Sequence, residues 1–154
     1  MSKTRKLFVV IISVFIALTL CFIFGNSFQT QQESVQNSGG IYDRVSHIFD
    51  AIFGAGVITH SIFRTLAHFS EFFVLGIEVA LLFFVASPKK SVSKLITFLT
   101  GLIVAIIDES LQFLNDRGPE VTDVLIDYLG YLSAVCFIIL IIIIVKRIHN
   151  KKSV

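Results

Sequence analysis

Apolar residues in this chain fall in four long, nearly uninterrupted runs, and a soluble domain would show amphipathic stripes instead. A helix needs roughly 20 mostly apolar residues to cross a bilayer. The runs of this length cover about residues 7–24, 66–86, 95–114 and 124–145. The pattern therefore predicts an all-α fold, an integral membrane four-helix bundle, formed by a single domain over residues 1–154.

The first run follows three basic residues, so a cleavable signal peptide is the alternative. The run is longer than the roughly 7 to 15 residues of a signal-peptide core, and no A-x-A cleavage site follows it. We therefore expect a retained helix.

Basic residues gather at the two ends of the chain and between the second and third runs. All of the Lys and Arg residues except Arg44, Arg64 and Arg117 lie there. The positive-inside rule places these segments in the cytoplasm, so both termini are expected there. None of the acidic residues falls in these basic segments, and the polar chemistry is consequently predicted on the extracellular side.

Residues 25–63 form a polar and amphipathic outer segment. Residues 25–40 read GNSFQTQQESVQNSGG, a composition that predicts a flexible loop. Apolar residues then recur at helical spacing, at Ile41, Val45, Ile48, Phe49 and Ile52. This spacing predicts a short amphipathic outer helix, either an interfacial anchor or a lid over the bundle. Gly54 and Gly56 end the pattern.

Charged residues enter the outer half of the second run at helical spacing. Arg64, His68, Glu71, Leu75 and Glu78 are separated by four, three, four and three residues, so they share one face. A charge facing lipid is costly, and this face should therefore turn into the bundle.

The third and fourth runs carry a second set of charges around the turn that joins them. Asp108, Glu109 and Gln112 can point into one sector of the third helix. Thr122 or Asp123 is expected to cap the fourth helix, and Asp123, Asp127 and Gly130 share one of its faces. The first run carries almost no polar residues, so helices two to four are predicted to form the working unit.

Three chemistries fit this set of polar residues. Asp108, Glu109, His68 and Glu71 suit general acid/base catalysis, in which one carboxyl keeps its proton while a neighbour stays ionised. Arg64 and Arg117 suit a clamp on a phosphate or carboxylate. A divalent cation held by His68, Glu71, Asp108 or Glu109 is the third option, but no diagnostic metal motif supports it, and we predict no cofactor. The structural alternative is a set of ion pairs that holds the helices in register.

The spacing of these residues resembles that of a known family. The pattern consists of Arg64-x-x-Ala67-His68-Phe69-x-Glu71 with Gly76, then Asp108-Glu109-x-x-Gln112-Phe113, Arg117-Gly118, Asp123-Val124-x-x-Asp127 and Gly130. It resembles the VanZ-like family of bacterial membrane proteins over roughly residues 26–133. The resemblance implies a multi-pass protein of the bacterial plasma membrane, and the family's founding member is associated with resistance to the lipid-tailed glycopeptide teicoplanin.

The resemblance carries over nine site residues but neither a substrate nor a reaction. If the protein is an enzyme, the catalytic residues are Asp108, Glu109, His68 and Glu71, and the ligand-binding residues are Arg64, Gln112, Arg117, Asp123 and Asp127. The expected partner is a membrane lipid, a lipid-linked cell-wall precursor or a lipoglycopeptide, and no nucleic acid is expected.

Two hypotheses follow from the residues and the resemblance together. One is a resistance-associated protein that binds such an amphiphile in a polar pocket of the outer leaflet. The other is a membrane-embedded enzyme that acts on a lipid head group or cell-wall precursor by carboxylate chemistry. A transporter is disfavoured, because the cytoplasmic halves of the runs are nearly bare apart from Glu78.

Overall fold

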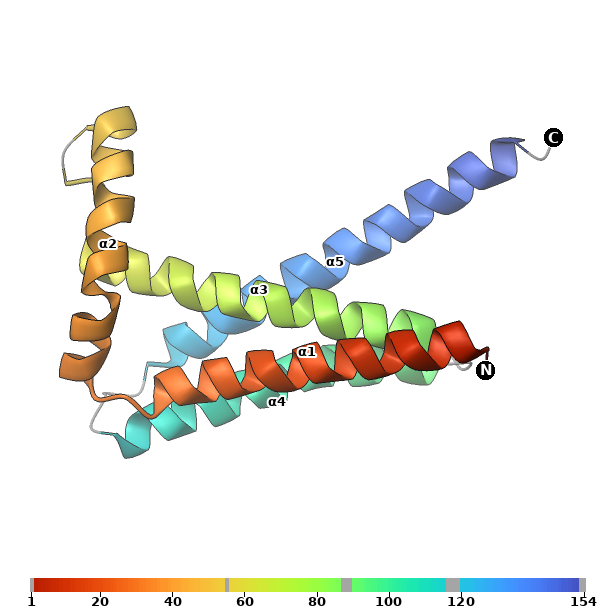
Figure 1. The fold of residues 1–154 in the computed structure, drawn as a ribbon, viewed down its shortest axis with the longest axis horizontal. Coiled ribbons are helices and arrows are strands. Elements are labelled where there is room, and N and C mark those ends of the chain that lie inside the picture. Colours follow the sequence, from red (N-terminus) through yellow and green to blue (C-terminus); the bar gives the residue numbers. More distant parts are fainter. Residues whose placement is uncertain (1, 55, 87–89, 116–119, 153–154) are drawn as a thin grey trace.

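A computed structural model describes residues 2–54, 56–86, 90–115 and 120–152 (Figure 1). The helices are α1 (Lys3–Ser27), α2 (Gln31–Phe53), α3 (His60–Ala86), α4 (Lys90–Leu114) and α5 (Val121–Lys152). Within those ranges there is no strand, and the prediction of an all-α chain is confirmed. All helices except α2 are long and apolar enough to cross a membrane. They include the four predicted runs and extend beyond them.

The membrane-length helices run along the long axis of the molecule, and α2 lies across one end of them (Figure 1). Both chain ends lie toward the opposite end. α3 packs most extensively against α5, and it also contacts α1 and α4. α5 crosses α3 near its own start and then diverges from the bundle. α3 is therefore the central helix of the fold.

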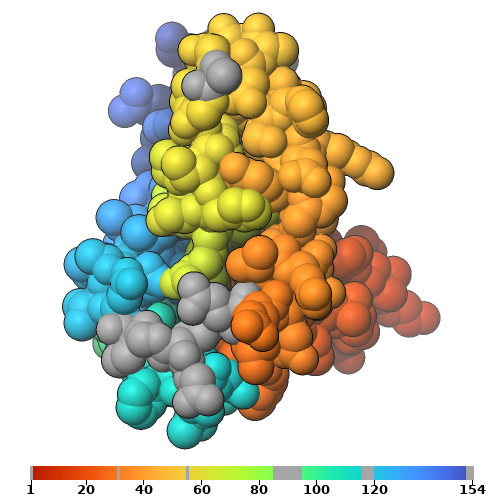
Figure 2. All heavy atoms as spheres, turned by 90° about the vertical axis from the view of Figure 1, so that its left-hand side faces the viewer, coloured from red at the N-terminus to blue at the C-terminus, as the bar shows by residue number. Residues whose placement is uncertain are grey.

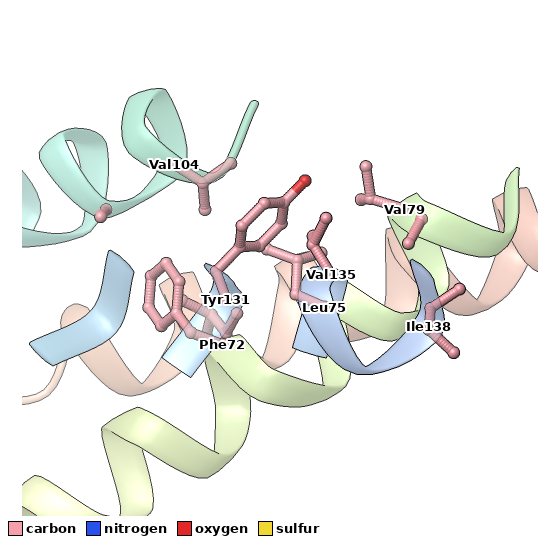
Figure 3. Packing of buried hydrophobic residues seen from close by; sticks show 10 residues of the cluster. Phe72, Leu75, Val79, Val104, Tyr131, Val135 and Ile138 are labelled. Carbon is pink, nitrogen blue, oxygen red and sulfur yellow. The ribbon is translucent and has the colours of Figure 1, made fainter. Parts of the chain in front are cut away.

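The apolar core forms where α3, α4 and α5 meet, and Ile23 of α1 also belongs to it (Figure 3). Phe72, Leu75 and Val79 enter it from one face of α3, because they repeat at intervals of three and four residues. Tyr131 of α5 is fully buried beside them, and its hydroxyl donates a hydrogen bond to the Thr97 carbonyl of α4 at 2.6 Å. This bond satisfies the one polar atom that the tyrosine brings into the core.

Glycines permit a close crossing of α3 and α5. A Cβ on Gly76 would lie 2.5 Å from the Tyr131 carbonyl oxygen and 2.8 Å from the Ala134 Cβ, and one on Gly130 would meet the backbone of Phe69. Small residues at such positions allow two membrane helices to approach until their backbones touch. The crossing therefore depends on the absence of a side chain at these sites.

The prediction of a flexible loop over residues 25–40 is wrong. Gly25 to Ser27 form the last turn of α1, and α2 begins at Gln31. The reason is a capping box: the Thr30 hydroxyl accepts a bond from the Glu33 amide, while the Glu33 carboxylate accepts one from the Thr30 amide at 2.9 Å. These bonds lower the pKa of the Glu33 carboxyl.

α2 lies where a short amphipathic helix was expected, but it is longer and spans 23 residues. It ends where predicted, at Gly54, which has a φ of 99°. Tyr42 holds α2 to the start of α3, because its ring stacks on that of His60 at 3.6 Å and its hydroxyl donates to the Ile58 carbonyl at 3.1 Å.

Gly130→Ala should destabilise the fold, because the added methyl group forces α5 away from the Phe69 backbone. We expect a loss of about 1–3 kcal/mol in the free energy of unfolding, the usual cost of overpacking. Titration with a denaturing detergent, followed by circular dichroism, measures it. Gly39→Ala in α2 is the matched control, because nothing lies within 4 Å of its Cβ position. Equal or greater stability of Gly130→Ala would contradict the close crossing.

Candidate functional site

A group of buried polar side chains lies at the α2 end of the bundle. Asp108, Gln112 and Asp127 are at most 2% exposed, and Glu109 is 9% exposed. These residues come from α4 and α5, and α3 adds His68 and Glu71 on the face that also carries the buried Leu75. The structure therefore brings together the charged residues of three helices that lie apart in the sequence.

The expectation that the first helix contributes almost nothing is wrong. Asn26 donates to Glu71 Oε1 at 3.1 Å, and Thr19 donates to Glu78 Oε1 at 3.0 Å. The hydroxyl of Ser27, which is fully buried, donates to Asp108 Oδ1. Each of these neutral donors faces a carboxylate, so α1 belongs to the working unit.

The sequence carries a signal for this role of α1. Thr19, Ile23 and Asn26 are separated by four and three residues, and Ser27 follows directly, so all four share one face of the helix. Ile23 and Ser27 are the two buried residues of α1. The polar spacing, read with the same rule as α3, would have identified this face.

The polar residues Asp108, Glu109 and Gln112 of α4 do not all make contacts in the same place. Gln112 Nε2 donates to Asp108 Oδ2 at 2.7 Å, so Asp108 accepts bonds from both Gln112 and Ser27. Glu109 Oε1 instead accepts the backbone N–H of Glu120 at 2.6 Å, which ties the end of α4 to the start of α5. Asp108 is thus held in one orientation inside the cluster, and Glu109 lies on the side toward the α4–α5 connection.

His68 lies between the carboxylates of α4 and α5. Its Nδ1 is 3.6 Å from Asp127 Oδ1 and 3.9 Å from Asp108 Oδ2. One possible ligand atom from each of the three side chains lies within 4.8 Å of the others. Both carboxylate oxygens of Asp127 are buried without a hydrogen-bond partner. We call His68, Asp108 and Asp127 the His–Asp cluster.

Arg64 and Asp123 form a separate ion pair nearer the surface. Arg64 Nη2 lies 2.5 Å from Asp123 Oδ2, and the two side chains are 38% and 16% exposed. The structural reading of the charges, as pairs that hold helices in register, fits this link between α3 and α5. Arg117, the other predicted clamp residue, lies outside the described residues.

The predicted helix cap is wrong by two or three residues. α5 begins at Val121, so Thr122 and Asp123 lie inside its first turn and do not precede it. Asp123 still interacts favourably with the helix dipole from this position. Because Asp123 does not cap the helix, its carboxylate can bind Arg64.

A cavity of about 740 Å³ opens between α2 and the ends of α1, α3 and α5. We call it the α2 cavity. Figure 2 views this end of the molecule and shows α2 lying alongside the start of α3. The polar side chains that line the α2 cavity include Asn26, Arg64, His68, Glu71 and Asp123. The apolar side chains that line it include Phe22, Val35 and Ile41. His68 connects it to the His–Asp cluster, whereas Glu109 is not among the described residues that line it.

A family model described as VanZ/LLP1 matches residues 9–144, which include all of the site residues. The chain belongs to the VanZ/LLP1 family. The predicted resemblance is confirmed, and the match together with the four membrane-length helices identifies a multi-pass membrane protein of this family. Searches of curated proteins and of solved structures gave no match.

Ser27→Ala should destabilise this VanZ/LLP1 protein, because it removes a buried donor from Asp108. A buried group left without its partner costs about 1–3 kcal/mol, and we expect a loss of this size in detergent-induced unfolding. Ser13→Ala, at an exposed serine of the same helix, is the control. If both variants unfold at the same detergent concentration, Ser27 does not support Asp108.

Proposed function

We propose that this VanZ/LLP1 protein binds the head group of a lipid-tailed amphiphile in the α2 cavity, and that this binding contributes to resistance to teicoplanin-type glycopeptides. The supporting observation is the α2 cavity itself. Its volume of about 740 Å³ falls within the roughly 300–1,000 Å³ typical of small-molecule sites. Its lining combines polar and apolar side chains, as an amphiphile requires.

The polar and apolar residues that line the α2 cavity lie in different parts of it, which suits the polar head group and the apolar tail of an amphiphile. Glu71 and His68 lie toward the bundle interior, where a polar head group would be desolvated and held. Phe22, Val35 and Ile41 are 59%, 48% and 60% exposed, so they offer apolar surface to an acyl or prenyl chain. An amphiphile would therefore enter with its head toward α3 and its tail along α1 and α2.

The chemistry of the lining favours a head group rich in hydrogen-bond donors. Glu71 Oε2 is buried without a partner, and the Arg64 guanidinium is already paired with Asp123. Unsatisfied acceptors bind hydroxyl or ammonium groups more readily than phosphate. A glycosylated lipid-linked precursor or lipoglycopeptide fits this lining better than a simple phosphate does.

The distribution of charge supports a cavity on the extracellular side. Both chain ends lie toward the end of the bundle opposite α2, and the basic residues near them favour a cytoplasmic location (Figure 1). α2 exposes Ile48 and Ile52, at 59% and 66%, as a helix lying in the membrane interface would. We therefore place α2 as an anchor on the outer leaflet of a bacterial plasma membrane.

Placing a bulky side chain in the α2 cavity should weaken binding while leaving the fold intact. Ser38 of α2 lines the cavity, and Ser38→Phe places an aromatic ring in it. We expect this variant, in lipid nanodiscs, to bind lipid-linked cell-wall precursor or teicoplanin at least about tenfold more weakly, a loss near 1.4 kcal/mol. Native mass spectrometry with titration measures it.

Ser46→Phe is the matched control, since Ser46 lies on α2, bonds a backbone carbonyl as Ser38 does, and does not line the cavity. Equal affinity of both variants and the wild type for every amphiphile tested would rule out the α2 cavity as the binding site. Loss of teicoplanin resistance in cells that carry Ser38→Phe, but not in cells that carry Ser46→Phe, would connect binding to resistance.

A second candidate function is catalysis on the bound head group. It is favoured by the position of His68 and Glu71, which lie one turn apart on α3 and both line the cavity. With Asp127 behind it, His68 is suited to proton transfer, and Glu71 supplies a second titratable group. Asp108 already accepts two hydrogen bonds and Glu109 faces Glu120, so this function would rest on His68 and Glu71.

Glu71→Gln tests the catalytic function directly, because glutamine keeps a side-chain oxygen that accepts the Asn26 hydrogen bond but has no ionisable carboxyl. With a labelled lipid-linked precursor as substrate, we expect turnover to fall by about 10²–10⁴-fold, the usual contribution of a general acid or base. Product analysis by mass spectrometry measures it. Glu120→Gln, at an exposed cavity residue, should retain turnover. Unchanged turnover in Glu71→Gln would exclude acid/base chemistry at Glu71.

A further inference from the structure

We propose that the His–Asp cluster binds a divalent transition-metal cation at the inner wall of the α2 cavity. The three side chains come from three different helices, with His68 on α3, Asp108 on α4 and Asp127 on α5. The site goes beyond amphiphile binding, because the ion would be held by protein ligands whether or not the cavity is occupied.

The separations of the His68 nitrogen from the two carboxylate oxygens fit a single ion. A metal bound at about 2.0–2.2 Å from nitrogen and oxygen ligands separates neighbouring ligand atoms by roughly 3–4 Å. In the His–Asp cluster, Nδ1 of His68 lies 3.6 Å from the Asp127 oxygen and 3.9 Å from the Asp108 oxygen. These distances exceed that of a hydrogen bond and match two ligands of one metal.

Asp127 provides independent support for a ligand at this point. The residue is fully buried, and neither of its carboxylate oxygens has a hydrogen-bond partner. A buried carboxylate without a partner is strongly disfavoured. A cation in contact with Asp127 would satisfy these two oxygens.

The Asp108 carboxylate is held by hydrogen bonds from neighbouring side chains, as the carboxylate ligands of protein metal sites normally are. Ser27 donates to one of its oxygens and Gln112 to the other. Such outer-shell bonds fix the orientation of a ligating carboxylate, and they are a regular feature of protein metal sites. Ser27 thus gains a role as a positioning residue for the ion.

The donor set selects the class of metal. One imidazole nitrogen and two carboxylates suit Zn²⁺ or Mn²⁺ better than Mg²⁺ or Ca²⁺, which take oxygen ligands. Three protein ligands leave a coordination position for water or a substrate oxygen, as in catalytic zinc sites. His68 also lines the α2 cavity, so the proposed ion site adjoins this cavity.

The experiment uses the full-length protein in nanodiscs, stripped with a chelator and titrated with Zn²⁺ and, separately, Mn²⁺. We expect saturable binding of one ion per chain by calorimetry, and an upward shift of the melting temperature on binding. Asp127→Asn, which preserves shape and removes the charge, should weaken binding by at least about 10–100-fold, as changes around metal sites commonly do.

Glu78→Gln is the control, because this acid lies on α3 outside the His–Asp cluster and bonds Thr19. It should bind the ion as the wild type does. No saturable binding by the wild type, or equal affinity in Asp127→Asn, would overturn the proposal. If Asp127→Asn does not fold, X-ray absorption of the wild type with bound Zn²⁺ decides the question: imidazole and oxygen neighbours support the site, and their absence refutes it. These outcomes do not depend on amphiphile binding, so failure of one proposal leaves the other testable.

Discussion

Buried carboxylates inside a membrane bundle are the constraint on which this structure depends. No water is available in hydrocarbon to solvate a carboxylate, so a hydrogen-bond donor or a cation is needed to stabilise one there. α1 supplies neutral donors to Glu71, Glu78 and Asp108, and α4 supplies Gln112. The contacts of α1 therefore join it to α3 and α4 by hydrogen bonds in addition to apolar packing.

The close crossing of α3 and α5 makes this arrangement geometrically feasible. With hydrogen in place of a side chain at Gly76 and Gly130, the two backbones touch, and His68 is brought opposite Asp127. A wider crossing would separate the helices that bear the His–Asp cluster. The same contact buries Tyr131, whose hydroxyl joins the core to α4. Apolar packing and the polar site therefore depend on the same pair of glycines.

Much of the fold and most of the candidate site follow from local rules applied to the sequence. Run length identifies the four membrane helices, and helical spacing identifies the inward face of α3 that carries His68 and Glu71. The polar composition of residues 25–40 predicts a loop, and the short capping signal of Thr30 with Glu33 is the feature that instead starts α2. The contribution of α1 does not follow from run length, because Asn26 and Ser27 lie beyond the apolar run, in the last turn of the helix. The α2 cavity could not be predicted, because it depends on where α2 lies relative to the other helices. The spacing of residues within one helix does not specify that position.

The short link between α1 and α2 has a mechanical consequence. Ser27 is bonded to Asp108, and Thr30 already caps α2, so only Phe28 and Gln29 separate the two attachments. A helix joined through so short a segment cannot move independently of its attachment point. A displacement of α2 would therefore act on Ser27 and, through the hydrogen bond of Ser27, on Asp108.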